Sequence, residues 1–414
     1  MAAAPVRRWV TVDGVSVPEV SPIVAHVAAA STRDGTGVES VTARHYGAPL
    51  VEQSRVDEGA TGLVDGWDRV ALTVTGAAAR GWLNDFISQK IDAAAPGTAT
   101  DGLLLDARGR IEQAFGISVV TPDNVDAEHS GAGDGDPVVV LDVAADRADD
   151  LEGFLRRMVF WSGVEIDRPA LARLSVLRPD GFPGTGAAGT SGAPHPLAVF
   201  WRTRQTSGIP VTDLWVPRER ITGVWDDLVS AGAVPTGGTA VDAWRLRDRV
   251  PVLGVDTDER VIPHEVPAFI GPESGEATRL ADAQDGPTSS SVHLNKGCYR
   301  GQETVSRVHN LGQPPRLLVL LQLDGSTGTL PEVGSSVTAG GRTVGRTGAP
   351  VHDADYGPVV LALVKRAVVE AAAAGTAPPL QADGVDAAID PDDLQFRRSE
   401  KPGRLAVDRL RGKG

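Results

Sequence analysis

The pattern of apolar and polar positions predicts a chain of short strands and helices. Alternation at every second position is typical of half-buried strands, whereas apolar residues three and four apart indicate amphipathic helices. Residues 9–12 and 15–17 flank Asp13 and Gly14, a pair that favours a tight hairpin turn. By the same criteria we expect a hairpin over 103–111 with Gly109 at its turn, strands at 69–74, 117–120, 138–143 and 171–177, and helices at 50–59, 77–87, 145–158, 218–231 and 238–249.

The pattern changes at Arg316. Short apolar runs follow at 317–323, 336–337, 342–347 and 359–364, and turns containing Gly or Pro separate them. This spacing is typical of a small β-barrel or sandwich. We therefore predict an α+β protein with a β-barrel as its last domain.

A chain of 414 residues is too long for one core, so two or three domains are expected. The predicted division has an extension at 1–42, a large α+β region at 43–315, a barrel domain at 316–396 and a basic tail at 397–414. Segments 121–137, 181–196 and 271–291 are rich in small and polar residues and predict surface loops. The second loop contains a nominal G-x-G-x-x-G spacing at 184–189, but no helix start follows it to receive a pyrophosphate.

The composition of the chain excludes several classes of function and of site. The chain has 40 basic and 54 acidic residues, a net charge of -14, which argues against general nucleic-acid binding. One cysteine permits no internal disulfide and no metal or iron–sulfur site built from several cysteines of this chain. The sequence shows no secretory signal, and the longest apolar run, 359–369, is interrupted by Lys365 and Arg366. We expect a cytoplasmic monomer without a membrane segment.

The single cysteine, Cys298, lies between Lys296 and Arg300. A lone cysteine is often an inert, small apolar residue. Here the neighbours are charged, polar or glycine, and nearby cations favour the thiolate, so we predict a partly exposed, functional thiol. A cysteine–histidine hydrolase is disfavoured, because His293 and His309 are close only in sequence and a base must lie within hydrogen-bonding reach.

Two further residues are candidates for ligand binding. Arg245 stands between Trp244 and Leu246 on a predicted helix, where a partly buried guanidinium would grip a carboxylate. Its neighbours Arg247 and Arg249 are better explained by surface ion pairs. Asp213 lies in an apolar strand, and its side chain faces either solvent or a pocket, where a carboxylate would read a ring edge rich in N–H donors.

These sites together resemble a known family. The segment 296–303 is similar to the K-G-C-Y-x-G-Q-E signature of the folate-binding YgfZ family, relatives of the glycine-cleavage T-protein, an aminomethyltransferase. The similarity extends over about 43–364 and includes 45–47, 59–65, 82–85, 88–90, 105–110 and 242–246. The matching signature residues are Lys296, Gly297, Cys298, Tyr299, Gly301, Gln302 and Glu303.

The resemblance implies a T-protein-like fold of three domains around a central cavity, with tetrahydrofolate or a derivative as cofactor and no metal site. In it, Asp213 would read the pterin and Arg245 would lie in the cavity. The T-protein carries a pair of aspartates where residues 110–113 read Arg-Ile-Glu-Gln, so Glu112 is the candidate catalytic substitute. Segment 205–210 also departs from the T-protein, and both changes weaken the case for aminomethyl transfer.

Three readings of the function follow from this resemblance. The leading one is a folate-binding accessory protein for iron–sulfur cluster assembly or repair, with Cys298 as the acting thiol. Its expected partners are folate and iron–sulfur enzymes or assembly factors, and the family also affects tRNA modification. The second is an aminomethyltransferase or another one-carbon transferase that uses Glu112. The third is a folate-free scaffold that binds a partner protein.

Overall fold

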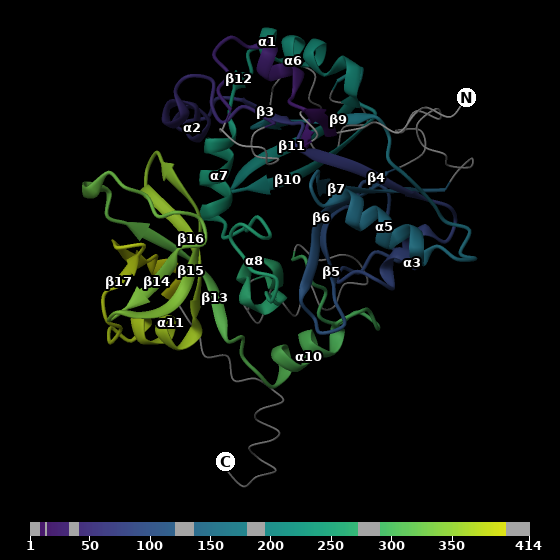
Figure 1. The fold of residues 1–414 in the computed structure, drawn as a ribbon. Coiled ribbons are helices and arrows are strands. Elements are labelled where there is room, and N and C mark those ends of the chain that lie inside the picture. The colour runs from purple at the N-terminus through teal and green to yellow at the C-terminus, as the bar shows by residue number, and fades with distance from the viewer. Residues whose placement is uncertain are drawn as a thin grey trace. The chain divides into compact units, whose positions relative to one another are not determined.

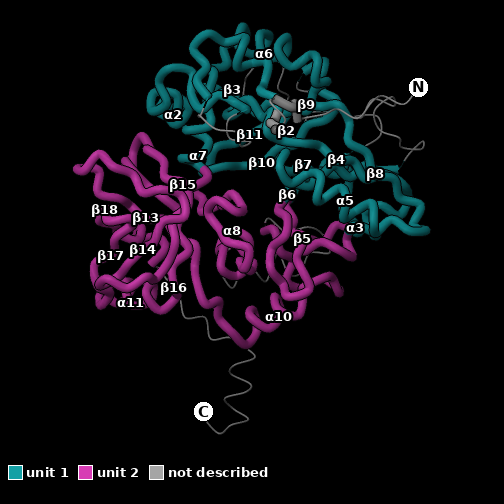
Figure 2. The backbone as a smooth tube through the Cα atoms, in the orientation of Figure 1, with its two compact units in different colours: residues 1–83, 92–100, 115–244 teal, residues 84–91, 101–114, 245–414 magenta. Residues whose placement is uncertain are grey.

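The structure, a computed structural model, describes residues 9–12, 15–32, 41–120, 136–179, 195–271 and 290–394. The loops expected at 121–137, 181–196 and 271–291 lie mostly outside these ranges, and the tail at 397–414 lies wholly outside them. The chain divides into two compact units (Figure 2). Unit 1 comprises Met1–Leu83, Asp92–Thr100 and Phe115–Trp244, and unit 2 comprises Asn84–Ile91, Asp101–Ala114 and Arg245–Gly414.

Unit 1 contains a five-stranded sheet in the order β10-β11-β9-β3-β12 (Figure 1). The strands are β10 (Phe200–Thr206), β11 (Ile209–Pro217), β9 (Leu171–Leu177), β3 (Gly62–Gly66) and β12 (Val234–Pro235). All neighbours are antiparallel except β12 and β3, which are parallel. Because side chains alternate across a strand, this sheet buries two different apolar faces.

One face of this sheet packs against two helices, α1 (Pro22–His26) and α6 (Ile221–Ser230), which follows the 3-10 turn η3 (Arg218–Arg220). Leucine and valine side chains from the strands meet the apolar stripe of α6 there. Figure 1 labels both helices beside this sheet, in the upper part of the picture. The buried residues of this core include Leu63, Leu174, Val176, Leu214, Val216, Ile221, Val224, Trp225 and Leu228.

The opposite face carries two separate apolar clusters. At one end the strands pack with α2 (Pro49–Asp57) and α7 (Gly238–Arg247), through Val56, Ala240 and Trp244. At the other end Leu171, Phe200 and Trp215 pack with Ala71, Val120, Val138 and Val140 from a second sheet. Between these clusters the same face carries charged residues, which form one of the candidate sites described below.

The second sheet has the order β5-β6-β7-β4-β8. Its strands are β5 (Ala99–Leu105), β6 (Ile111–Val120), β7 (Val138–Ala144), β4 (Arg69–Thr75) and β8 (Glu165–Asp167), and the nearby helices are α3 (Ala79–Asn84) and α5 (Ala148–Met158). A separate strand pair, β1 (Trp9–Val12) and β2 (Val15–Pro18), confirms the first predicted hairpin. The division between the units passes through the sequences of β5 and β6.

Unit 2 contains a closed barrel in the order β13-β16-β15-β14-β17-β18. Its strands are Arg316–Leu323 (β13), Ser336–Ala339 (β14), Arg342–Asp353 (β15), Gly357–Lys365 (β16), Leu380–Ala382 (β17) and Val385–Ile389 (β18), with α11 (Arg366–Ala373) packed on β13 and β16. Closure leaves no exposed sheet edge. Unit 2 also contains η4 (Pro263–Glu265), α8 (Pro267–Ile270), α10 (Gln302–Asn310), η5 (Gly325–Thr327) and η6 (Pro391–Leu394).

The structure confirms the α+β class and the C-terminal barrel. The barrel is closed, whereas the sequence pattern was compatible with either a barrel or a sandwich. The prediction of a helix over 77–87 is wrong beyond Asn84, because Ile87 bridges Leu104 and Ser88 donates to the Leu103 carbonyl. Strands β17 and β18, which are 3 and 5 residues long, were missed. None of the helices in the described ranges is long and apolar enough to cross a membrane.

Candidate functional site

The signature segment is anchored in unit 2 by Lys296, which is 5% exposed. Its Nζ donates to the backbone carbonyls of Asn84 at 2.5 Å, Ile87 at 2.8 Å and Gln89 at 2.9 Å. An ammonium group has three N–H donors, so these carbonyls take up its full capacity. Lys296 therefore holds the 84–89 loop.

Cys298 is exposed, as the sequence predicted. Its neighbour Tyr299 points the other way: the side chain is 8% exposed, and Lys296 Nζ lies 5.1 Å from its ring centroid. Burial raises the pKa of the Tyr299 phenol, and its hydroxyl has no hydrogen-bond partner among the described residues. Two buried side chains thus hold a segment whose thiol faces outward.

Arg300 forms a forked ion pair with Glu112 on β6. The Nη1–Oε2 distance is 2.6 Å and the Nη2–Oε1 distance is 3.4 Å, and the two side chains are 35% and 40% exposed. A pair with this exposure contributes at most about 1 kcal/mol to stability. The structure therefore brings Glu112 and the signature segment together through Arg300, one of the two cations that flank the thiol in the sequence.

The end of the signature segment contacts the β5–β6 turn. Gly301 adopts φ of 81° at the start of α10, and a Cβ there would lie 2.6 Å from the Asp106 carbonyl oxygen. Gly109, with φ of 77°, makes the predicted turn, and Thr304 Oγ1 donates to the Arg108 carbonyl at 2.8 Å. Glycine is required at both positions, because other residues rarely adopt this conformation and a side chain would collide.

Three further signature residues have modest roles in the structure. Gln302 Nε2 donates to the Lys296 carbonyl at 3.3 Å and so closes the segment on itself. Gly297 and Glu303 are exposed.

Among the described residues, Cys298 has no hydrogen bond or ion pair, so the structure gives it no histidine base. The described residues also contain no group of three His, Cys, Asp or Glu side chains placed to hold a metal ion.

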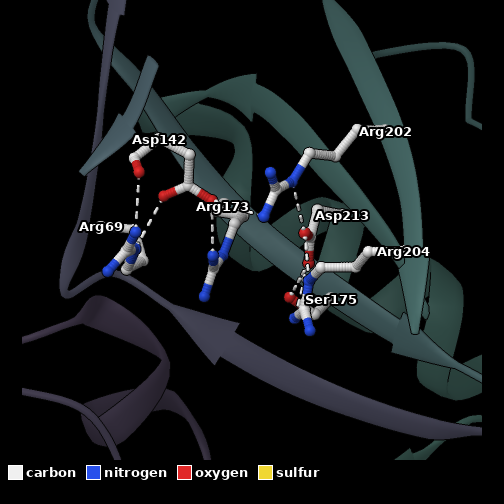
Figure 3. A network of polar contacts seen from close by, with 7 residues as sticks. All are labelled: Arg69, Asp142, Arg173, Ser175, Arg202, Arg204 and Asp213. Atoms are coloured by element: carbon white, nitrogen blue, oxygen red, sulfur yellow. Dashed lines mark hydrogen bonds and ion pairs between the residues drawn. The ribbon is translucent and has the colours of Figure 1, made fainter. Parts of the chain in front are cut away.

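Asp213 lies in unit 1 and is fully buried, but its carboxylate is already occupied (Figure 3). Oδ1 accepts from Ser175 Oγ at 2.6 Å and Arg204 Nη2 at 3.2 Å. Oδ2 accepts from Arg204 Nε at 2.7 Å and Arg202 Nε at 3.1 Å. Although burial opposes ionisation, the surrounding guanidinium groups, Arg204 above all, hold the pKa of Asp213 well below its usual range.

A second buried carboxylate, Asp142 on β7, continues this network. Oδ1 accepts from Arg69 Nε at 2.7 Å, and Oδ2 accepts from Arg173 Nη1 at 2.7 Å. Arg202 Nη2 lies 3.7 Å from the same Oδ2, so this guanidinium links the two carboxylates. Despite its burial, Asp142 has a pKa held below the usual range by Arg173, Arg69 and Arg202. We call Arg69, Asp142, Arg173, Arg202, Asp213 and Arg204 the ion chain.

Arg245 also has a partner within the protein, in unit 2. Its Nη1 donates to Asp256 Oδ2 at 2.7 Å, and the side chain is 13% exposed. The neighbouring arginines do form ion pairs, but with distant and largely buried carboxylates and not along the helix surface: Arg247 binds Asp353 and Arg249 binds Asp390. Arg245 grips a carboxylate as predicted, but the carboxylate belongs to this chain.

Sequence reasoning missed the arginines of the ion chain, although a local signal was present. Ser207 and Gly208 form a two-residue turn with φ of 49° and 72°, the pattern of a tight hairpin. That turn pairs Thr206 with Ile209 and, further along, Arg202 with Asp213. No comparable local signal in the sequence indicates that Arg69 and Asp142 belong to the ion chain, because both residues come from the other sheet.

The fold is therefore α+β with a closed C-terminal barrel. Among solved structures, the glycine cleavage system aminomethyltransferase T of Bartonella henselae matches with a TM-score of 0.65. The match covers 91% of this chain and 98% of that chain at 16% sequence identity. At this identity the likeness shows the fold alone, and the chain has the T-protein fold.

An aminomethyltransferase of Alcanivorax borkumensis is 28% identical to the chain over 235 residues. The aligned region covers 53% of this chain and 61% of that enzyme, so the chain spans less than two thirds of this curated relative. No protein-family model matches the chain. About half of the chain is therefore similar in sequence to an aminomethyltransferase.

Proposed function

We propose that the protein is a tetrahydrofolate-binding accessory factor for the assembly or repair of iron–sulfur enzymes, with Cys298 as its acting thiol. The observation that carries the proposal is the anchored signature segment. Lys296 and Tyr299 are buried on either side of an exposed Cys298, and Gly301 fixes the chain direction after it. Buried neighbours hold this one thiol exposed to solvent. In that position it can react with an iron–sulfur cluster of a partner protein, or bind that cluster as a ligand.

The residues of this chain limit what the thiol can do alone. One cysteine supplies at most one cysteine ligand to a cluster, so the other ligands come from the partner or from small thiols. Cys298 would deliver or accept the cluster as cargo and would not store it. The remaining contacts of the segment keep the thiol exposed while the partner approaches.

The folate part of the proposal comes from the resemblance of the signature and from the fold. Asp213 and Arg245 are its proposed contacts, and their present partners constrain how binding would occur. The four hydrogen bonds on Asp213 fill the acceptor sites that a carboxylate offers. Asp213 therefore does not fit a pterin edge while Arg204 remains in place, and Arg245 would have to leave Asp256 to bind a ligand.

The test separates thiol chemistry from ligand binding. We expect the Cys298→Ala protein to bind tetrahydrofolate with the wild-type Kd in calorimetry. Cells that carry only this variant should lose the activity of iron–sulfur enzymes, whereas Ser306→Ala, an exposed position on α10, should retain it. Normal iron–sulfur enzyme activity with Cys298→Ala would refute the role of the thiol, and absence of tetrahydrofolate binding to the wild type would favour a folate-free scaffold.

A second candidate function is one-carbon transfer. It is favoured by the similarity to a named aminomethyltransferase and by the position of Glu112, which Arg300 holds next to the signature segment. In this reading Glu112 supplies the polar catalytic group. Turnover of an aminomethylated carrier with tetrahydrofolate, lost in Glu112→Gln and retained in Glu303→Gln, would support it. No turnover by the wild-type protein would exclude it.

A further inference from the structure

The loop between α5 and β8 in unit 1 presents two aromatic side chains to solvent. Phe160 is 80% exposed and Trp161 is fully exposed, which makes them the most exposed large apolar side chains among the described residues. Aromatic side chains normally bury most of their area, and at protein interfaces tryptophan is enriched among the residues that carry most of the binding energy. Two adjacent aromatic residues with this exposure therefore indicate a contact surface.

Contacts within unit 1 hold this loop at both of its ends. At its start, Trp82 Nε1 on α3 donates to the Met158 carbonyl at 3.2 Å. At its end, the backbone of Gly163 passes so close to Gly76 that a Cβ on Gly76 would collide with the Gly163 carbonyl oxygen. The two aromatic side chains are therefore presented by a loop that the rest of the unit fixes in place.

The backbone at Phe160 is strained. Its φ is 38°, a value that bulky residues rarely adopt, because the side chain then crowds the backbone. The Ser162 backbone N–H donates to the Val159 carbonyl at 2.9 Å and so closes a turn around Phe160 and Trp161. Strained positions persist only where the surrounding structure holds them, and they cluster at functional sites. The strain at Phe160 is thus a second observation that points to this loop.

The strand that follows the loop, β8, is at the edge of its sheet. Of the strands in the described ranges it pairs with β4 alone. Figure 2 labels it next to β4 and α5 at one side of unit 1. An edge strand offers backbone N–H and C=O groups to a further strand, and many proteins bind an extended peptide segment in this way. The edge of β8 therefore fits an extended chain.

An open pocket of about 380 Å³ lies along this edge. Side chains alternate along β8, so that Ile166 is buried whereas Glu165 and Asp167 are exposed. A segment paired with β8 would therefore meet two carboxylates on one face of the sheet and the side of Ile166 on the other. The pocket is lined by Arg156, Val159, Val164, Glu165, Ile166 and Asp167.

The carboxylates of Glu165 and Asp167 determine the charge that suits this edge. Neither forms an ion pair with another described residue. The nearby Arg156 and Arg168 are already paired with an acidic residue of α5. Residues 149–168 include five acidic and three basic residues, so the charge of this region favours a basic partner over the anionic surface of a membrane.

We propose that β8 and the aromatic pair Phe160 and Trp161 form a docking site for an extended segment of a partner protein in which basic and apolar residues alternate. The segment adds to the free edge of β8 through backbone hydrogen bonds. Its basic side chains pair with Glu165 and Asp167, and its apolar side chains beyond the start of β8 cover the aromatic pair. The site is in unit 1 and depends neither on Cys298 nor on folate binding.

Fluorescence anisotropy on the full chain tests the site with a short labelled peptide of alternating lysine and valine. We expect this peptide to bind saturably. A peptide with glutamate in place of lysine should bind about tenfold more weakly, because like charges then face each other. A lysine–valine peptide with N-methylated backbone amides keeps the side chains, loses the strand hydrogen bonds, and should weaken to a similar extent. No binding of the first peptide, or equal binding of either control peptide, would overturn the proposal.

Variants locate the binding. Trp161→Ala should weaken it about tenfold, whereas Leu50→Ala, another exposed apolar residue of unit 1, should leave it unchanged. The double variant Glu165→Lys with Asp167→Lys should prefer the glutamate peptide, and Glu219→Lys, at an exposed position of η3, should keep the preference for lysine. This reversal is a gain of binding, which a misfolded variant would not show. Unchanged binding in Trp161→Ala, or no reversal in a folded double variant, would contradict the proposed site.

A second copy of this chain is the alternative occupant of the edge. Sedimentation velocity distinguishes the two, because pairing between copies would produce a dimer that Trp161→Ala abolishes. We expect the wild-type chain to show no such dimer at the concentrations at which the lysine–valine peptide binds. A dimer that depends on Trp161 and excludes the peptide would replace the partner protein by a second copy and so refute the proposal.

Discussion

Asp65 should make unit 1 less stable as the pH rises towards neutrality. This carboxyl is 6% exposed on β3, its Oδ1 accepts from the Trp67 backbone N–H at 3.0 Å, and its Oδ2 has no partner among the described residues. Burial raises the pKa of Asp65 from 3.8 to about 7. The folded protein therefore retains a proton on Asp65 at pH values where the unfolded chain has lost it.

The sign and the size of this change in stability with pH follow from proton linkage. Stability falls with pH wherever the folded state binds more protons, so the loss begins near pH 4 and levels off above about pH 7. One pKa unit corresponds to about 1.4 kcal/mol, so a rise of about three units gives an upper limit of about 4 kcal/mol. Asp65→Asn cannot ionise, yet its side-chain oxygen still accepts from Trp67. The variant should therefore be more stable than the wild type at pH 8 and nearly equal to it at pH 4.

Urea unfolding of both proteins between pH 4 and pH 8 measures this difference. Subtracting the two curves cancels the titration of the groups that they share. Asp146→Asn, at an exposed position of unit 1, is the matched control and should follow the wild type across the series. A difference between Asp65→Asn and the wild type that stays constant with pH would refute the reasoning.

Three other substitutions and one chemical treatment test this account of the structure. Gly116→Ala should destabilise the protein by about 3–5 kcal/mol, because the new methyl group displaces Arg202 from a buried ion pair. Gly223→Ala, on the exposed side of α6 with open space around it, should stabilise by up to about 1 kcal/mol, and similar urea midpoints for the two would contradict this account. Lys296→Met should cost about 2–3 kcal/mol in urea unfolding, since it removes a charged donor from buried carbonyls, and an unchanged midpoint would argue against the anchor. In native protein, Cys298 should react with a thiol reagent about as fast as in urea, and strong protection in the folded state would contradict its exposure.

The sequence by itself determined the local elements and the exposed thiol. Alternation predicted strand 171–177, which β9 matches at both ends, and the turn at Gly109. The polar and glycine neighbours of Cys298 predicted its exposure, and the structure confirms it. These features depend on backbone preference and on the contrast between apolar and polar side chains within a few residues, which the order of residues records directly.

Only the tertiary structure decided which groups meet. Lys296 binds carbonyls more than 200 residues earlier in the chain, and Asp213 receives arginines of its own sheet in place of the ligand expected from its apolar surroundings. The sequence pattern shows that a charge will be buried but not what will neutralise it. Burial makes neutralisation obligatory, and strand register and sheet packing choose the partner, because a hydrogen bond requires donor and acceptor within about 3 Å.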